Sequence, residues 1–262
     1  MPVVGARPST RNAGSASVSK RSFQTLLLVL GLLGANVASA DTIVFQEGAL
    51  LPGGGPYTGT QDTEIRGTDP ATPLGDALLM RADLEDPNAG VDSEAQALLR
   101  FEGLFGALPD QIPLGSTLTS AVLTLYVTNA SNVPVGNISL YQMTSTWDET
   151  STWDSMVSGV QIGSEAEASA DDTHTVEVPN ALTSFDVLAS LQAWLGGDTN
   201  FGWVIVNDSN DGVQFRTSES GSASERPMLT VTFTPVPEPG SLALAGLTGA
   251  AALCVRRARR SR

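Results

Sequence analysis

Two adjacent carboxylates lie between two tryptophans in the segment Trp147-Asp-Glu-Thr-Ser-Thr-Trp153. Glycoside hydrolases place a pair of carboxyl groups on either side of the scissile bond, so Asp148 and Glu149 are the strongest candidates for such chemistry. The separation of the two groups in a cleft decides whether they can act, and it depends on the fold. Sugar stacking and core packing remain the other possible roles for the tryptophans.

Other catalytic chemistry has little support in the sequence. His174 is the only histidine, and a Ser-His-Asp triad would have to use it. No G-x-S-x-G nucleophile motif occurs, and zinc catalysis needs clustered His or Cys ligands. We therefore expect His174 to be exposed in a polar loop and the protein to be non-catalytic, with carboxylate-based polysaccharide cleavage as the enzymatic alternative.

Two kinds of binding site are compatible with the composition. Aromatic rings line many ligand sites and stack on sugars. The candidates for such a carbohydrate platform are Tyr57, Trp147 and Trp203. Carboxylate oxygens are the preferred ligands of Ca²⁺. The candidates for a metal site are Asp62, Asp83, Glu85 and Asp86.

The segment Asn207–Gly212 resembles the start of an EF-hand loop, but Ser218 stands where the twelfth-position glutamate is required. It lies between two apolar runs and ends in Asp211-Gly212, which is typical of a hairpin connection. We therefore predict a turn here rather than a calcium loop.

Short apolar runs separated by Gly, Pro, Asn and Asp indicate strands throughout the body. In 120–127 the apolar residues alternate with Thr and Tyr, as in a half-buried strand. The expected strands are 98–101, 120–127, 137–143, 202–206, 213–215 and 228–233. Turn residues recur about every ten positions, which predicts an all-β, antiparallel, jelly-roll-like β-sandwich.

One segment, 184–197, has apolar residues at helical spacing. Asp186 or Ser184 can cap its beginning, and Gly196 can adopt the left-handed conformation at its end. We expect a single short helix packed across one end of the sandwich.

The first 40 residues have the three parts of a secretory signal peptide. Lys20 and Arg21 precede an apolar run of about a dozen residues, and Ala38-Ser-Ala40 provides the cleavage site for signal peptidase. The run is too short for a transmembrane helix, which needs about 20 residues. We predict that the mature chain begins at Asp41.

The charge of the body excludes one class of partner. Between Asp41 and Pro237 there are five arginines, no lysine and 27 acidic residues, a formal charge of −22. Nucleic acids and anionic lipids bind proteins through Lys and Arg, so we expect neither partner. The only cysteine, Cys254, lies near the end, so the body must be stable without disulfides.

The last residues combine three features. Val236-Pro-Glu-Pro239 is followed by an apolar run, 241–255, and then by five arginines. As a helix the run would be about 22 Å long, slightly short for stable spanning. The arginines would hold its end on the cytoplasmic side, and the prolines keep Glu238 in extended, accessible backbone. A permanent C-terminal anchor is the alternative to temporary retention.

The body resembles DNRLRE-type domains, β-sandwiches grouped with carbohydrate-binding modules. The similar pieces occur in the same order along the chain: 62–66, 97–101, 113–126, 147–153, 185–194, 200–203, 215–219 and 226–231. The resemblance implies that Trp147 and Trp153 pack in the sandwich or at its edge. The opening, 41–73, is longer and richer in glycine than in the family, and 155–175 lacks a further tryptophan.

The tail resembles a PEP-CTERM sorting signal. The resemblance implies transient retention in the inner membrane, cleavage by an exosortase near Val236-Pro237-Glu238-Pro239, and transfer to the surface or extracellular matrix of a Gram-negative bacterium. Such systems accompany exopolysaccharide production. The predicted organisation is a signal peptide (1–40), a β-sandwich domain (41–234) and a sorting signal (235–262).

The sequence therefore predicts an exported, non-catalytic protein that binds or organises polysaccharide. Because the body is strongly acidic, the glycan should be neutral, or acidic and bridged by Ca²⁺. The alternative is a structural surface protein without a sugar ligand.

Overall fold

The computed structural model describes residues 39–84, 93–128, 136–175, 178–209 and 211–235. Several predicted residues lie outside this part of the chain: Ala38, Glu85, Asp86, Val236, Pro237, Glu238 and Pro239. Ala40 is described and is exposed. Within the described ranges, no helix has the length and apolar character needed to cross a membrane. The expected sorting helix lies outside them.

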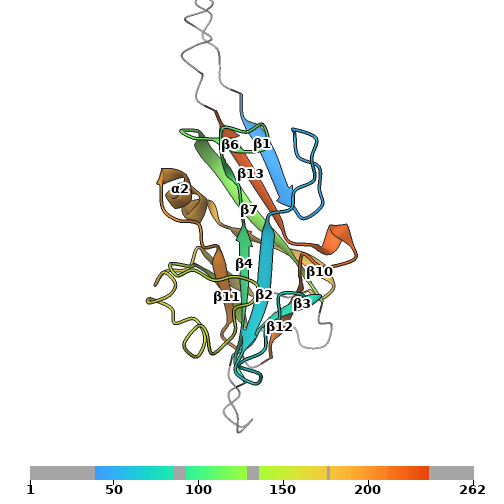
Figure 1. Ribbon diagram of the computed structural model, residues 1–262, viewed down its shortest axis with the longest axis vertical. Helices are drawn as coiled ribbons and strands as arrows, with labels where there is room; N and C mark the ends of the chain where they lie inside the picture. The colour runs from blue at the N-terminus through green and yellow to red at the C-terminus, as the bar shows by residue number, and fades with distance from the viewer. Residues whose placement is uncertain (1–38, 85–92, 129–135, 176–177, 210, 236–262) are drawn as a thin grey trace, which may run out of the picture. The chain divides into compact units, whose positions relative to one another are not determined.

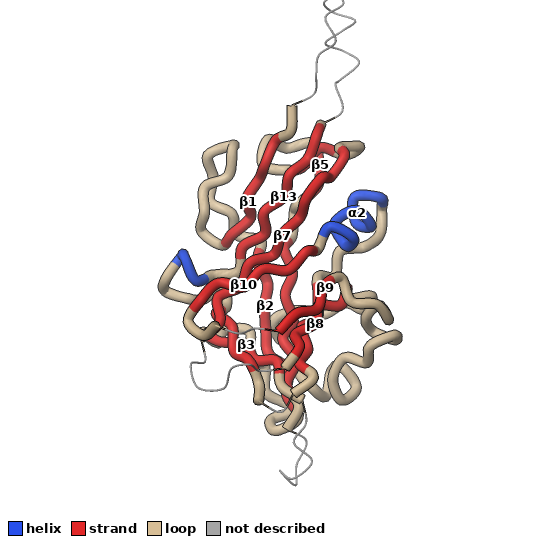
Figure 2. The backbone as a smooth tube through the Cα atoms, turned by 180° about the vertical axis from the view of Figure 1, so that it is seen from behind, coloured by secondary structure: helices blue, strands red, loops and turns tan. Residues whose placement is uncertain are grey.

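The first sheet has six strands and is antiparallel throughout. Its order is β1 (Asp41–Gln46), β13 (Met228–Thr234), β7 (Thr117–Val127), β12 (Val213–Arg216) and β3 (Leu79–Ala82), with β10 (Ala181–Asp186) also paired to β7. The eleven-residue strand β7 therefore joins three neighbours along its length. Figure 2 shows β1, β13, β7 and β10 side by side.

The second sheet has five antiparallel strands. Its order is β2 (Thr60–Arg66), β4 (Ala95–Phe101), β11 (Trp203–Asn207), β8 (Asn137–Gln142) and β9 (Asp172–Thr175). Strand β2 is thus an edge strand. A separate short parallel pair is formed by β5 (Phe105–Gly106) and β6 (Ile112–Pro113). Figure 1 shows β2, β4 and β11 in front of the first sheet.

Side-chain alternation explains how the two sheets pack. Along β7, Ala121, Leu123, Leu125 and Val127 are buried, as the period-2 pattern predicted. They join apolar residues of the second sheet, among them Leu99, in the main core. Burial of such side chains contributes about 25 cal/mol per Å² of apolar surface, which drives the two sheets together. The all-β, antiparallel prediction is confirmed.

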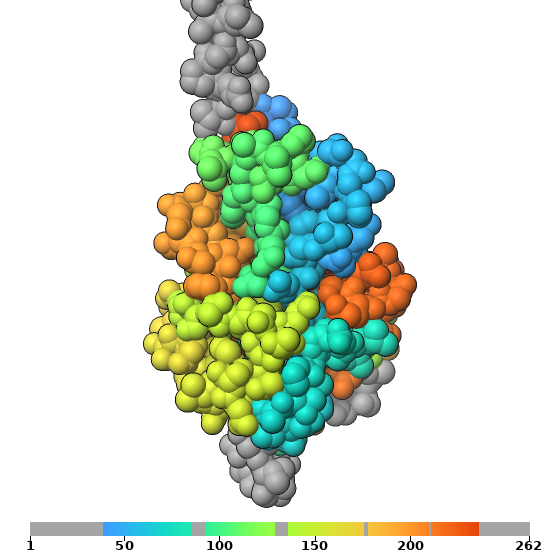
Figure 3. All heavy atoms as spheres, in the orientation of Figure 1, coloured from blue at the N-terminus to red at the C-terminus, as the bar shows by residue number. Residues whose placement is uncertain are grey.

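A second apolar cluster lies on the opposite face of the β2–β9 sheet. The segment after β8 folds back over this face, where Trp147, Trp153 and Met156 pack on Leu98 and Val204. Figure 3 shows this segment, in yellow-green, at the surface of the molecule. Both faces of β4 and β11 are therefore covered, which explains why these strands are almost continuously buried.

The predicted helix is present but shorter than expected. Helix α2 spans Leu188–Gly196, because Ser184–Asp186 are the end of β10. The left-handed residue is Gly197 (φ 118°) rather than Gly196. The carboxylate of Asp186 accepts a hydrogen bond from the Leu188 N–H (2.9 Å) although the N-cap position is Val187. Leu191 and Trp194 anchor the helix in the main core.

The two ends of the described body meet at one end of the sandwich. Strands β1 and β13 are neighbours, and Asp41 pairs with Phe233 (Figure 1). The predicted new N-terminus and the start of the predicted sorting signal therefore lie close together. Among the described residues, both core clusters are formed by side chains between 43 and 233.

Candidate functional site

The three aromatic residues predicted as a carbohydrate platform are buried. Tyr57, Trp147 and Trp203 are 5%, 4% and 0% exposed. A ring with no exposed face cannot stack on a sugar, so these residues do not form a platform in this structure. Every other Phe, Trp and Tyr in the described ranges is buried or partly exposed.

The polar atoms of these rings are used inside the protein. The Tyr57 hydroxyl donates to the Glu102 carbonyl oxygen (2.9 Å), and the Trp147 Nε1–H donates to that of Phe201 (2.6 Å). The guanidinium of Arg100 lies over the Trp147 ring, 5.2 Å from its centre. These contacts agree with the packing role that the family resemblance implied for Trp147.

Trp203 lies at the centre of a buried polar network. Its Nε1–H donates to Oδ2 of Asp171 (2.8 Å) and lies 3.2 Å from Oγ of Ser190, which itself donates to Asp171. Burial is the main cause that raises the pKa of Asp171, and its two hydrogen bonds oppose the shift only in part. The network joins the helix to the second sheet and has a structural role.

The predicted metal residues do not form one site among the described residues. Asp62 is fully buried beside Ser218, whereas Asp83 lies near Arg81 on the end of β3. Glu85 and Asp86 lie outside the described ranges. Within those ranges, no three His, Cys, Asp or Glu side chains are grouped as metal ligands.

The two candidate carboxylates, Asp148 and Glu149, differ from each other in their surroundings. The side chain of Asp148 accepts two hydrogen bonds from Thr150, which hold its pKa below the ordinary value. Burial and the nearby charge of Glu219 raise the pKa of Glu149. In the sequence the pair lies between Trp147 and Trp153. Both rings are buried, so a sugar cannot stack on them.

His174 is not in an exposed loop as predicted. It lies within β9 and is about one-third exposed, with its ring stacked on Phe185 at 4.2 Å. Its Nε2 is 2.8 Å from the hydroxyl of Thr183. The prediction was wrong because the polar residues around His174 form an edge strand.

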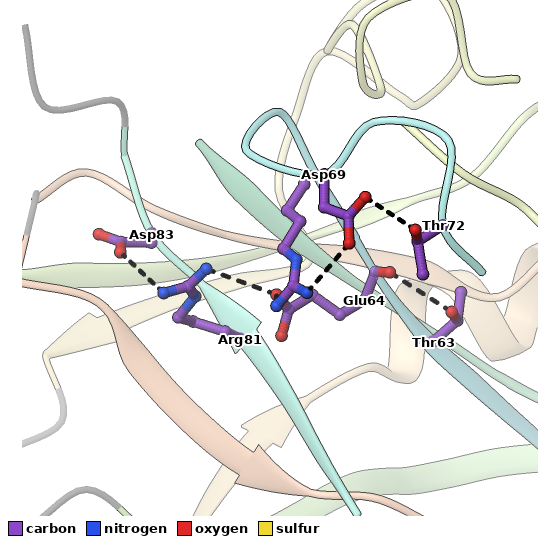
Figure 4. A network of polar contacts seen from close by, with 7 residues as sticks. Thr63, Glu64, Asp69, Thr72, Arg81 and Asp83 are labelled. Carbon is purple, nitrogen blue, oxygen red and sulfur yellow. Dashed lines mark hydrogen bonds and ion pairs between the residues drawn. The ribbon is translucent and has the colours of Figure 1, made fainter. Parts of the chain in front are cut away.

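Ion pairs among the described residues join Glu64, Arg66, Asp69, Arg81 and Asp83 in an arginine–carboxylate network. Both arginines approach Oε1 of Glu64 at 3.5 Å. Arg66 also approaches Asp69 (3.6 Å), and Arg81 approaches Asp83 (3.9 Å). Figure 4 shows Arg81 between Glu64 and Asp83, with Asp69 bonded to Thr72.

The network fixes two guanidinium groups at the surface. Glu64 is nearly buried, and burial raises its pKa while Arg81 and Arg66 oppose the shift. The arginine side chains remain about 30% exposed (31% and 29%) and so can reach a ligand. Their planar, fixed donors suit hydroxyl pairs and carboxylates. The motif Asp62-Thr-Glu-Ile-Arg66 was visible in the sequence, but its contact with Arg81 depends on the fold.

A cleft of about 540 Å³ lies at the end of the sandwich where the described chain ends meet. Its lining includes Ile43, Leu108, Pro109, Phe233 and Pro235. Among the described residues that line it, only Asp41 is charged. The cleft therefore has few of the polar groups that orient a sugar.

Two models of known families match the chain. Residues 56–233 match the model of carbohydrate-binding module family 96, and residues 235–260 match the PEP-CTERM protein-sorting motif. No curated protein matches the chain. The first match covers more than half of the chain and nearly all of the sandwich. The chain therefore belongs to carbohydrate-binding module family 96.

Proposed function

We propose that the protein is a non-catalytic polysaccharide-binding protein that an exosortase delivers to the cell surface or extracellular matrix. The observation that carries the proposal is the order of the two family matches. A carbohydrate-binding module (56–233) is followed directly by a sorting motif (235–260). Signal peptidase would release the N-terminus, and the sorting segment would hold the chain in the inner membrane until the exosortase acts.

Recognition of the glycan would depend on polar groups rather than on ring stacking. The three rings expected to form a platform, Tyr57, Trp147 and Trp203, are buried. We propose Arg66 and Arg81 as glycan contacts, because the shared carboxylate of Glu64 fixes both groups at the surface. Their donors suit the hydroxyl pairs of a neutral glycan. An acidic glycan would need bridging Ca²⁺, because the body carries a charge of −22.

Affinity electrophoresis tests this proposal. Residues 41–234 are run through gels that contain neutral or acidic polysaccharides, with Ca²⁺ or with EDTA. We expect retardation by neutral glycans in both conditions and by acidic glycans only with Ca²⁺. Unchanged mobility across a broad panel would contradict glycan binding and favour a structural matrix protein. Release of reducing ends from the retarding glycan would contradict the non-catalytic role.

A matched pair of variants tests the proposed contacts. Arg81→Gln removes one of the two guanidinium groups and should reduce retardation several-fold. Arg216→Gln is the control for the loss of an arginine, because Arg216 is similarly exposed (33%) and lies on the adjacent strand β12 but pairs with Glu225 rather than with Glu64. Retardation of Arg81→Gln equal to that of the wild type would exclude Arg81 as a glycan contact.

A further inference from the structure

Three buried oxygen atoms near the start of β2 have no hydrogen-bond partner among the described residues. They are Oγ1 of Thr60, Oδ1 of Asp62 and Oε2 of Glu219. Asp62 is 0% exposed, and its other oxygen accepts a hydrogen bond from the Ser218 N–H (2.8 Å). The Ser218 hydroxyl donates to the other oxygen of Glu219 (2.9 Å). A buried polar atom without a partner is costly, so such a group needs an explanation.

The strand register shows where these side chains point. Thr60 and Asp62 pair with Phe101 and Leu99 of β4, and both of these belong to the main core. Directly paired residues lie on the same face of a sheet. Thr60 and Asp62 therefore point between the two sheets, at the edge where the segment after β12 brings Glu219 close.

Glu64, two residues further along the same face of β2, provides a direct comparison. Its carboxylate is also nearly buried, but Arg66 and Arg81 both neutralise it. In the described part of the chain, no arginine forms an ion pair with Asp62 or Glu219. The charged neighbour that acts most on Asp62 is Glu219, which has the same sign.

We propose that Asp62, Glu219 and Thr60 form a buried Ca²⁺ site between the sheets at the β2 edge. Ca²⁺ takes six to eight oxygen ligands in flexible geometry, and its carboxylate ligands can be bidentate, so the three side chains would supply a large part of this set. Mg²⁺ fits less well, because it requires a nearly ideal octahedron. The cation supplies the positive charge that two arginines supply at Glu64.

This cation has a different role from a Ca²⁺ ion that bridges the protein to a glycan. Asp62 has no exposed surface, so a glycan cannot contact a cation at its carboxylate. The site instead fixes β2 and the segment after β12, both of which lie inside the family-96 match. The inference does not depend on glycan binding.

A shared proton is the competing explanation for the close approach of Asp62 and Glu219. Burial, and then the charge of Glu219, raises the pKa of Asp62, and a side-chain hydrogen bond with Glu219 raises it further. Glu149 also faces Glu219, with Asp76 and Glu47 nearby, and all of these groups are acidic. Protons and Ca²⁺ therefore compete, and Ca²⁺ affinity should fall as pH falls.

Equilibrium dialysis measures Ca²⁺ binding, and thermal unfolding measures its effect on stability. Both are carried out on the full chain and, in parallel, on residues 41–234, which hold both described cores. We expect one tightly bound Ca²⁺ per chain. A Ca²⁺ concentration about a hundredfold above its Kd should raise Tm by about 5–10 °C relative to EDTA at pH 7. The rise should become smaller as pH falls.

Two variants separate the cation from the shared proton. Asp62→Asn keeps an oxygen for the Ser218 N–H but removes a charged ligand, and should weaken Ca²⁺ binding at least tenfold. Asp198→Asn, an exposed residue, is the control and should leave binding unchanged.

Wild-type protein that binds no Ca²⁺ and shows the same Tm with Ca²⁺ and EDTA would overturn the site, whether or not the variants fold. Equal Ca²⁺ binding by Asp62→Asn and Asp198→Asn would overturn it as well. Retardation by a neutral glycan is measured separately, so failure of this site and failure of the proposed function are distinguishable.

Discussion

Replacing Trp203 with phenylalanine distinguishes a core tryptophan from a sugar-binding tryptophan. Phenylalanine keeps an aromatic ring in the main core but loses the Nε1–H that donates to Asp171 (2.8 Å). A hydrogen bond to a carboxylate stabilises a protein by about 1.5–3 kcal/mol. For a domain of this size, each kcal/mol corresponds to about 2–4 °C in Tm, so Trp203→Phe should lower Tm by about 3–12 °C.

The neighbouring Trp194 provides the matched control. Its ring lies 4.8 Å from that of Trp203 and is 5% exposed, but its Nε1 has no hydrogen-bond partner among the described residues. Trp194→Phe therefore loses packing without losing a hydrogen bond. We expect a decrease in Tm clearly smaller than that of Trp203→Phe.

Thermal unfolding followed by circular dichroism measures both variants. Affinity electrophoresis at 20 °C, where both remain folded, then measures glycan binding. We expect Trp203→Phe to be less stable and to bind glycan as the wild type does. Unchanged stability together with lost glycan binding would refute the argument and return Trp203 to the carbohydrate platform.

Two further predictions concern the same sheet. Gly202→Ala should greatly destabilise the fold, because Gly202 has φ +74° and an added Cβ would overlap the Leu99 carbonyl oxygen. A variant with unchanged Tm would contradict this geometry. Asp171→Asn should flatten the dependence of stability on pH. The pKa of Asp171 is raised in the folded state, so wild-type stability should fall as pH rises from the ordinary value, 3.8, through the raised one. Denaturant titrations across that range measure the difference, and parallel wild-type and variant curves would show that Asp171 does not titrate as inferred.

The strands that the sequence predicted share a physical property. Strand β7 and the others that were identified carry apolar side chains on the face that packs in the core, and alternation reveals them. Strand β2 was not among them, because Thr60, Asp62 and Glu64 occupy its inward face. Strand β9, with Asp-Thr-His-Thr, was read as a loop for the same reason.

The helix shows a limit of local patterns. Helical spacing identified Leu188–Gly196 but extended the helix into 184–186, which pair with β7. The hydrogen bonds of β10 with β7 override the local preference, and this partner lies about sixty residues away in the sequence. A sequence pattern contains no information on that competition.

The candidate functional residues also fall into two groups, those that the sequence alone identifies and those whose role depends on the fold. The segment Val236–Pro239 and the apolar and arginine-rich residues after it are contiguous, so the sequence alone identified the sorting signal, and the family match confirms it. The aromatic residues were recognised as candidates, but whether a ring is exposed depends on what the fold packs against it. Only the tertiary structure showed that Tyr57, Trp147 and Trp203 are buried.

The sequence by itself determined the all-β class, the acidic charge of the body and the sorting signal, because each is a property of composition or of neighbouring residues. Only the tertiary structure decided which polar residues contact one another. It placed Arg81 beside Glu64, and Ser218 against Asp62 across 156 positions of sequence. Sheet register and burial determine these contacts, and both result from the packing of the whole chain.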